Sequence, residues 1–139
     1  TIEQVIAATE SIAPCFEIVD SRIRDWKIGI VDTISDNASC GVFVLGDARA
    51  DPREHDLPSL HVTVTKNGLP LSEGYGSAVQ GNPAQAVAWL ANTLGSYGVT
   101  LDAGDIILSG SVVPLAPAEK GDLFEMTLHG IGTCKARFL

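Results

Sequence analysis

The sequence lacks the basic clusters and long apolar runs that mark nucleic-acid-binding and membrane-spanning proteins. It has 9 lysines and arginines against 17 aspartates and glutamates, which gives a formal net charge of −8. Its basic residues are scattered, apart from the group Arg22, Arg24 and Lys27. Binding to phosphate backbones needs clustered positive charge, so this balance argues against a nucleic-acid surface. No apolar run approaches the roughly 20 residues needed to span a bilayer.

Cysteine is also scarce, and its spacing is not that of a zinc site. Cys15, Cys40 and Cys134 lie far apart and form no CxxC pair. An odd number of cysteines without metal-ligand spacing indicates reduced thiols, as in a cytoplasmic protein. We interpret each cysteine as a small apolar residue of the interior. The length of 139 residues and the hydrophobic content of 45% predict one globular domain with its own core.

Short β-prone segments separated by turn residues make up most of the chain. Alternation and apolar runs predict strands at 15–20, 42–45, 60–65, 69–75, 106–108, 123–128 and 133–138. Of these, 15–20, 42–45 and 106–108 are predicted to be buried. Asn67-Gly68 between two such segments indicates a hairpin turn.

Two helices are expected. Thr1 and Gln4 have the spacing of a capping box at the start of a short helix. Asn82-Pro83 opens one long helix that ends near Gly95, and we expect this helix to cover a sheet face. The chain is therefore predicted to be a β-rich α+β domain, with a rolled or sandwiched mixed sheet and one main covering helix.

Two carboxylates, Glu17 and Asp20, lie in an otherwise apolar predicted strand. A core strand normally excludes such groups, because a desolvated carboxylate is destabilising unless a cation or hydrogen-bond donors compensate for it. Alternation places Glu17 and Asp20 on opposite faces, so they need different partners. A metal ion suits one of them, and Arg22 or Arg24 suits the other. The alternative is a strand end at which both acids reach water.

Three further polar segments adjoin predicted strands: Asp36–Gly41, Ser109–Ser111 and Gly130–Gly132. Functional sites commonly form at strand ends, although each of these segments also fits an ordinary turn. No Ser-His-Asp set is recognisable, and the three histidines are interpreted as surface residues.

Five segments taken together resemble one known family. They are Pro14–Ile23, Asp25–Ile28, Asp36–Gly41, Val87–Gly95 and Ile107–Ser111. The resemblance is to the 2-oxopent-4-enoate (2-hydroxypenta-2,4-dienoate) hydratases, in the hydratase/decarboxylase family of the fumarylacetoacetate-hydrolase-like superfamily. These enzymes act in the bacterial meta-cleavage of catechols. The resemblance spans essentially the whole chain, and it implies the C-terminal fold of that superfamily.

The resemblance also implies a site and a reaction. The family holds Mg²⁺ or Mn²⁺ with three acidic side chains, and Glu17 matches the third of them. Ser39 matches a serine placed near the substrate, and Asn37 lies beside it. Ser111 and the amide of Gly110 match the region that contacts the substrate carboxylate. The implied reaction is hydration of 2-hydroxypenta-2,4-dienoate to 4-hydroxy-2-oxopentanoate.

In the family, the other two metal ligands form a Glu-x-Glu pair upstream of the position of Thr1. We therefore expect residues 1–139 to be a C-terminal catalytic-type domain that is inactive alone. Two alternatives stay open: 4-oxalocrotonate decarboxylation, and a non-catalytic fragment or interaction subunit. The resemblance further implies a cytoplasmic homo-oligomer, sometimes in complex with 4-oxalocrotonate decarboxylase or with the downstream aldolase.

Overall fold

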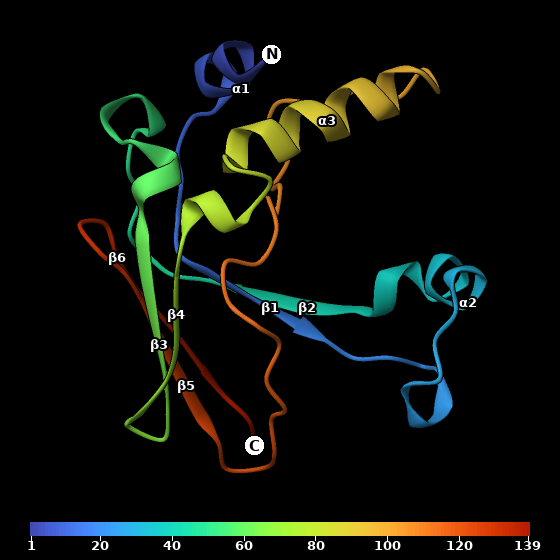
Figure 1. Ribbon diagram of the computed structural model, residues 1–139, viewed down its shortest axis with the longest axis vertical. Helices are drawn as coiled ribbons and strands as arrows, with labels where there is room; N and C mark the ends of the chain where they lie inside the picture. The colour runs from blue at the N-terminus through green and yellow to red at the C-terminus, as the bar shows by residue number, and fades with distance from the viewer.

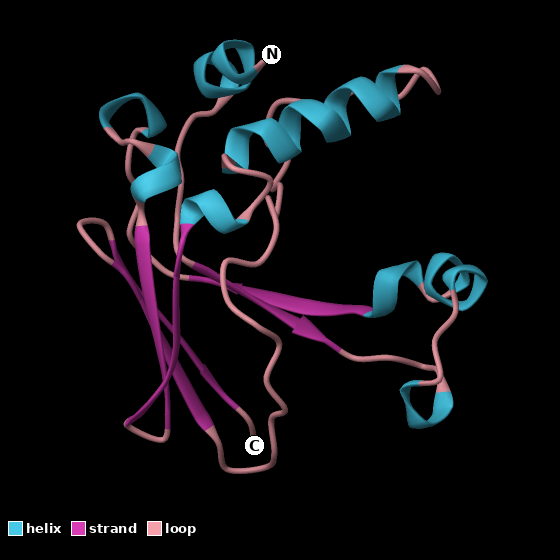
Figure 2. Ribbon diagram, in the orientation of Figure 1, coloured by secondary structure: helices cyan, strands magenta, loops and turns pink.

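The computed structural model describes residues 1–139 as two antiparallel sheets with three α-helices (Figures 1 and 2). The α-helices are α1 (Ile2–Ala8), α2 (Ile30–Ser35) and α3 (Pro83–Gly95). The strands are β1 (Cys15–Val19), β2 (Cys40–Leu45), β3 (His61–Lys66), β4 (Leu69–Tyr75), β5 (Leu123–Leu128) and β6 (Gly132–Arg137). Short 3-10 turns are η1 (Arg24–Trp26), η2 (Asn37–Ser39), η3 (Pro52–Glu54), η4 (Leu57–Ser59) and η5 (Gly76–Ala78). No helix is both long and apolar enough to cross a bilayer.

The larger sheet has the strand order β4-β3-β5-β6, and β1 pairs with β2 in a separate ribbon. The predicted hairpin is confirmed: Asn67 and Gly68 join β3 to β4 with φ angles of 54° and 79°. Positive φ at both central residues is typical of the tight turns that match strand twist. The sequence analysis predicted a mixed sheet. Every pairing in the structure is antiparallel, so this part of the prediction is wrong.

The core lies on one face of the larger sheet. Alternation along β3 buries Val62 and Val64, as expected for a sheet with one dry face. Phe124 of β5 is also buried, and its ring makes edge-to-face contacts with Phe16 of β1 and Phe138, with centroids 6.4 and 5.8 Å apart. Phe16 near the start of β1 and its partner Val44 near the end of β2 pack against this core. The β1–β2 ribbon therefore contacts the sheet at this end. Beyond it the ribbon extends away from the sheet towards α2 (Figure 1).

The one main helix predicted from sequence is confirmed as α3. Its N-cap is Asn82, whose side chain accepts a hydrogen bond from the Ala84 N–H at 2.9 Å. The buried residues of α3 are Ala84 and Ala88, whereas Trp89 is 58% exposed. Its principal packing partners are α1 and η4 rather than strands, so the expected covering of a sheet face is wrong: α3 closes one end of the molecule above the sheet (Figure 1).

The predicted strand at 106–108 is wrong. This segment has no regular structure, and no N–H of residues 106–112 donates to a backbone acceptor within the chain. A strand needs backbone pairing with a neighbouring strand, and this segment pairs with none, although β4 and β6 each have a free edge. Ile106 is accordingly exposed. Further along, the segment crosses β4 so closely that a Cβ at Gly74 would clash with the carbonyl oxygen of Val112.

The predicted burial of 42–45 is also wrong, although the strand itself exists. Val42 is 62% exposed and Phe43 is 45% exposed on β2. Only the end of β2, at Val44, packs against the core. The interior position predicted for each cysteine holds for Cys134 and fails for Cys40, which is exposed; all three thiols are free.

A polar cluster closes the hairpin end of the larger sheet at Asp122. The Asp122 carboxylate accepts hydrogen bonds from Lys66 Nζ at 2.8 Å, Asn67 Nδ2 at 2.8 Å and the Glu119 N–H at 2.7 Å. These donors, Lys66 foremost, lower the pKa of Asp122 from 3.8 to about 2. The carboxylate therefore stabilises the folded state fully above its unfolded-state pKa, and this stabilisation is lost as the pH falls from 3.8 to about 2.

We expect Asp122→Asn to be less stable than the parent at neutral pH and to lose less stability on acidification. Urea unfolding followed by circular dichroism at a series of acidic pH values measures this difference. Asp56→Asn is the control, because Asp56 is exposed and its carboxylate accepts no hydrogen bond within the chain. An unchanged pH dependence in Asp122→Asn would show that the Asp122 contacts do not stabilise the fold.

Candidate functional site

An open concavity of about 1830 Å³ lies among the β1–β2 ribbon, the buried face of the larger sheet and the segment 101–118. Its lining includes Glu17, Gly110 and Ser111. These three predicted site residues share the lining with many others, since 59 residues from Thr1 to Phe138 line the concavity. Asn37 and Ser39 lie outside this lining. The concavity is much larger than the roughly 300–1,000 Å³ of a small-molecule pocket.

Glu17 lies on β1 opposite Phe43, and its side chain is exposed. The carboxylate makes no ion pair in the chain, so the predicted desolvation is wrong. Asp20 is exposed as well, and only its backbone carbonyl contacts Arg22. Both acids reach water in this chain, which was the alternative left open by the sequence.

The 139 residues do not provide a complete metal centre. No group of three His, Cys, Asp or Glu side chains lies close enough together to hold a metal ion. Glu17 offers one carboxylate of the oxygen type that Mg²⁺ and Mn²⁺ prefer. The donor set of this chain alone therefore does not fit the three-carboxylate site implied by the sequence resemblance.

The densest hydrogen-bond network of the chain surrounds the carboxylate of Asp36, which is 6% exposed. Arg22 Nε donates to its Oδ1 at 2.5 Å. Its Oδ2 accepts from Ser39 Oγ at 2.8 Å, Ser21 Oγ at 3.0 Å and the Arg22 N–H at 3.2 Å. Burial by itself would raise the pKa of Asp36, but these donors outweigh it and lower the pKa below its ordinary value. Asp36 is therefore an ionised acceptor at neutral pH.

The turn η2, which follows Asp36, has an unusual backbone. Its residues Asn37–Ser39 have φ angles of 50°, 56° and 55°, in the left-handed region, and none is glycine. This conformation costs about 1–2 kcal/mol per residue for L-amino acids. Arg22 spans the turn, since its guanidinium donates to the Asp36 carbonyl on one side and to the Cys40 carbonyl, at 2.8 Å, on the other.

Gly110 and Ser111 offer backbone donors rather than a free hydroxyl. Gly110 has a φ of 126°, a conformation that side chains rarely allow. Neither N–H donates to an acceptor within the chain. The Ser111 hydroxyl donates to the Val113 carbonyl at 2.6 Å, so its one proton is already used. These two N–H groups are therefore unpaired, as are the other N–H groups of 106–112, and they can donate to an anionic ligand.

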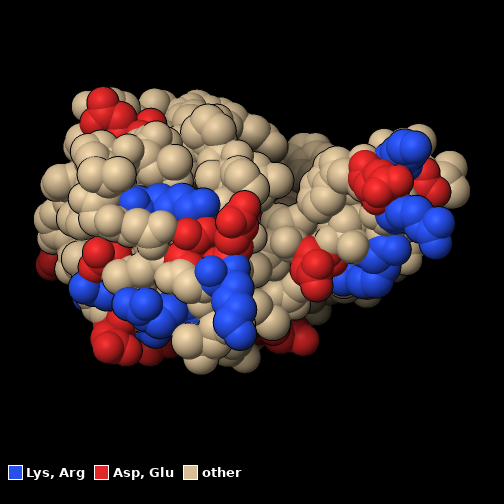
Figure 3. All heavy atoms as spheres, turned by 90° about the horizontal axis from the view of Figure 1, so that it is seen from below, with Lys and Arg blue, Asp and Glu red and all other residues tan.

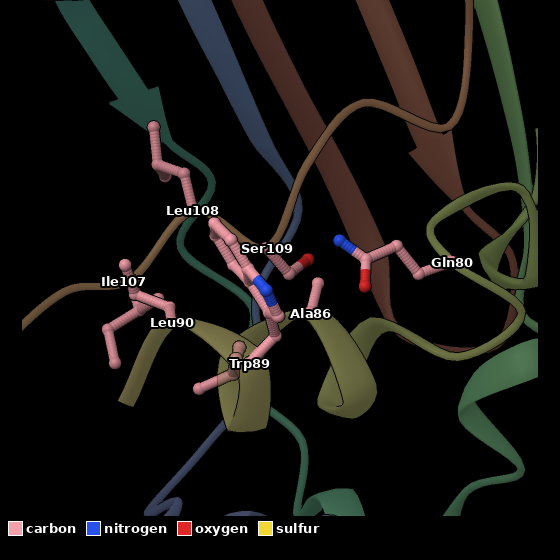
Figure 4. Close-up of a pocket in the computed structure, with 8 residues that line it drawn as sticks. Gln80, Ala86, Trp89, Leu90, Ile107, Leu108 and Ser109 are labelled. Carbon is pink, nitrogen blue, oxygen red and sulfur yellow. The ribbon is translucent and has the colours of Figure 1, made fainter. Parts of the chain in front are cut away.

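A smaller cavity of about 210 Å³ lies between α3 and the segment at Ile107–Ser109 (Figure 4). Trp89 and Leu90 form apolar walls, and the Gln80 amide and Ser109 hydroxyl lie at its polar side. The sequence predicted the helix that carries Trp89, but it did not predict a cavity there or single out Gln80. On the face seen from below, acidic and basic side chains are interspersed, with no large patch of one sign (Figure 3).

Comparison with known proteins places this chain in a family. The family model described as fumarylacetoacetate (FAA) hydrolase C-terminal matches residues 2–139. The chain belongs to the fumarylacetoacetate hydrolase family.

Among curated proteins, it is 60% identical over 138 residues to "2-hydroxyhexa-2,4-dienoate hydratase" of Comamonas testosteroni, covering 99% of this chain and 52% of that protein. It is 43% identical over 138 residues to "2-keto-4-pentenoate hydratase" of Paraburkholderia xenovorans, covering 99% of this chain and 51% of that relative.

A solved structure shares the fold. The 4-oxalocrotonate decarboxylase of Pseudomonas putida G7, complexed with magnesium and adipate, matches with a TM-score of 0.95 and 36% identity, over 99% of this chain and 52% of that one. A second structure of that decarboxylase, complexed with calcium and acetate, matches with a TM-score of 0.91. The predicted fold class and family resemblance are therefore confirmed. The chain spans about half the length of the relatives it matches.

Proposed function

We propose that the protein carrying this chain is a hydro-lyase that converts 2-hydroxypenta-2,4-dienoate to 4-hydroxy-2-oxopentanoate in the meta-cleavage degradation of catechols and related aromatics. The supporting observation is the identity to two dienoate hydratases: 60% over 138 residues to one named for 2-hydroxyhexa-2,4-dienoate, and 59% over 99 residues to one named for 2-hydroxypent-2,4-dienoate. Identity to the 4-oxalocrotonate decarboxylase is 36%, although the fold is the same. The higher identity favours hydration over decarboxylation.

The proposed reaction adds one water molecule in two stages. The enol proton leaves the C2 oxygen and a proton is added at C5, which gives a ketone conjugated with a C3–C4 double bond. The oxygen of water then bonds to C4, and C3 receives a proton. The C2 oxygen gains negative charge in the first stage and again during the addition, so hydrogen-bond donors or a cation near it lower the barrier.

In this proposal, the N–H groups of Gly110 and Ser111 bind the substrate carboxylate. All the N–H groups of 106–112 are unpaired and line the concavity, and the family resemblance selects these two. Glu17 supplies one oxygen ligand to a divalent cation, Mg²⁺ or Mn²⁺, whose other ligands come from outside these residues. Such a cation supplies Lewis-acid stabilisation of negative charge on the substrate. Asn37 and Ser39 orient substrate or water from the turn η2.

The test is a comparison of two substrates with protein of the relatives' full length that contains this chain. We expect 2-hydroxypenta-2,4-dienoate to be consumed with formation of 4-hydroxy-2-oxopentanoate, and 4-oxalocrotonate to release little CO₂. The 139-residue chain alone is expected to show no turnover. Faster CO₂ release from 4-oxalocrotonate would favour the decarboxylase alternative. The absence of both activities would favour a non-catalytic interaction subunit.

We also propose that the protein is a cytoplasmic homo-oligomer. Three free thiols are consistent with a reducing compartment. Exposed apolar residues on the projecting ribbon and on α2, such as Phe43 and Ile34, offer area for contact with other protein surfaces. A complex with 4-oxalocrotonate decarboxylase is a further proposal, to be tested by co-purification.

A further inference from the structure

We propose that Asp36, held by Arg22, fixes the Ser39 hydroxyl as a hydrogen-bond acceptor towards the ligand. Asp36 and Arg22 are then positioning residues, and Ser39 accepts a hydrogen bond from an O–H group where the sequence resemblance suggested only a serine near the substrate. The identity of that ligand rests on the proposed function. The direction of the hydrogen bond rests on the contacts around Asp36.

The Ser39 hydroxyl has already used its one proton. A serine hydroxyl has one proton, and an ionised carboxylate can only accept. Ser39 Oγ lies 2.8 Å from Asp36 Oδ2, so the Ser39 proton points at the carboxylate. Ser39 therefore has only lone pairs left for any other partner.

Ser39 and Ser21 differ in whether their hydroxyl oxygens accept a hydrogen bond within the chain. Ser21 Oγ also donates to Asp36 Oδ2, at 3.0 Å, but it accepts a hydrogen bond from the Ile23 N–H at 3.1 Å. No donor within the chain reaches Ser39 Oγ. Ser39 is thus the hydroxyl of this network that keeps unused acceptor capacity. Ser39 is 3% exposed and lies outside the lining of the concavity, so the O–H donor assigned to it in this proposal is water, the smallest that the proposed reaction contains.

Backbone hydrogen bonds hold Ser39 in place. Its N–H donates to the Asp36 carbonyl at 2.9 Å, and its carbonyl accepts from the Asp20 N–H at 2.9 Å. These bonds tie the left-handed turn η2 to β1, and the guanidinium of Arg22 connects the carbonyls on either side of the turn. A Cβ at Gly41, the second residue of β2, would clash with the Ile18 carbonyl oxygen, so β1 and β2 must approach closely here. A turn of intrinsically unfavourable conformation keeps its geometry only while such contacts remain.

The kinetic test uses full-length protein that contains this chain, with the variants Asp36→Asn, Ser39→Ala and their double mutant. An asparagine side chain can donate to Ser39, which would let the serine proton turn towards the ligand. We expect Asp36→Asn to lower kcat about 10- to 100-fold, the range known for outer partners of site residues, with a smaller change in KM. The matched control is Asp51→Asn, which removes another aspartate–arginine pair, with Arg53 at 2.7 Å, outside this network.

The double mutant separates positioning from a structural role. If Asp36 acts through Ser39, adding Asp36→Asn to Ser39→Ala lowers kcat no further. If the fold-loss of kcat in the double mutant equals the product of the losses in the two single variants, Asp36 does not act through Ser39 and the proposal is overturned. Arg22→Lys keeps the charge but not the fork that connects the two carbonyls, and it is expected to lower kcat less than Asp36→Asn does.

A spectroscopic readout tests the hydrogen bond independently of turnover. The ¹³Cγ resonance of Asp36 is expected to shift between H₂O and D₂O because exchangeable protons point at its carboxylate. Ser39→Ala should reduce this isotope shift, since one donor is lost. An unchanged shift would overturn the proposal even if the protein is an active hydratase. Conversely, a parent protein without hydratase activity would overturn the proposed function, while the isotope shift would still decide the direction of the Ser39 hydrogen bond.

Discussion

Replacement of Phe124 by alanine is expected to lower the free energy of unfolding by about 3–5 kcal/mol, the usual cost of emptying a buried aromatic site. Phe124 is 7% exposed and lies at the centre of the core. Its ring contacts Phe16 and Phe138 edge-to-face and lies under the Lys66 ammonium group, 5.4 Å from the ring centroid. Because a domain of this size has about 5–15 kcal/mol of stability, a large share would be lost.

Urea unfolding of the parent and variant, with equal m-values as the check on two-state behaviour, measures this loss. Tyr97→Ala is the matched control, since it also removes an aromatic ring but Tyr97 is 79% exposed. We expect the control to change stability by less than about 0.5 kcal/mol. Equal effects of the two substitutions would contradict the assignment of Phe124 to the core.

The features that local sequence determines were predicted correctly. The capping box of α1 is present, with the Gln4 N–H donating to Thr1 Oγ1 at 3.3 Å and the N-terminal amine donating to Gln4 Oε1 at 2.9 Å. The hairpin at Asn67 and Gly68 and the Asn82 cap of α3 were also predicted. Each depends on residues within a few positions of one another, so the pattern in the sequence is sufficient to predict it.

The failures concern features that depend on distant partners. Ile106–Leu108 has the apolar, β-prone composition of a strand, but composition does not show whether a free strand edge lies beside it. Val42 and Phe43 have the composition of a buried strand and are exposed on a ribbon that extends from the sheet. In both cases the apolar, β-prone composition was identified correctly. Burial of these residues depends on surfaces that the 139 residues do not supply.

The candidate site was predicted in the same uneven way. The sequence resemblance drew attention to the segments that contain Arg22, Asp36 and Ser39, but it did not show that they bond to one another. Arg22 or Arg24 was expected to pair with one acid of the strand at 15–20, but Arg22 pairs with Asp36 instead. Arg22 and Asp36 are 14 positions apart, and only the reversal of the chain between β1 and β2 brings them together.

In the full-length protein, Glu17→Gln is expected to lower kcat/KM for the dienoate at least about 100-fold, because even the outer partners of metal ligands contribute 10- to 100-fold. Desolvation of the Glu17 carboxylate, the reason given by the sequence, is not the basis of this expectation. Glu17 is exposed in this chain, so no desolvation demands a cation. The prediction rests on the family resemblance, which matches Glu17 to a metal ligand, and on its carboxylate, which makes no ion pair within the chain.

The exposure of Glu17 also predicts that its substitution leaves the fold intact. Surface substitutions usually change stability by less than about 0.5 kcal/mol, so the melting temperature of Glu17→Gln should match that of the parent. Titration calorimetry with Mn²⁺ should show weaker binding in Glu17→Gln and unchanged binding in the control Glu54→Gln, whose carboxylate is exposed on η3. Retention of both Mn²⁺ affinity and turnover in Glu17→Gln would exclude Glu17 as a ligand. A parallel loss of folding would instead make its role structural.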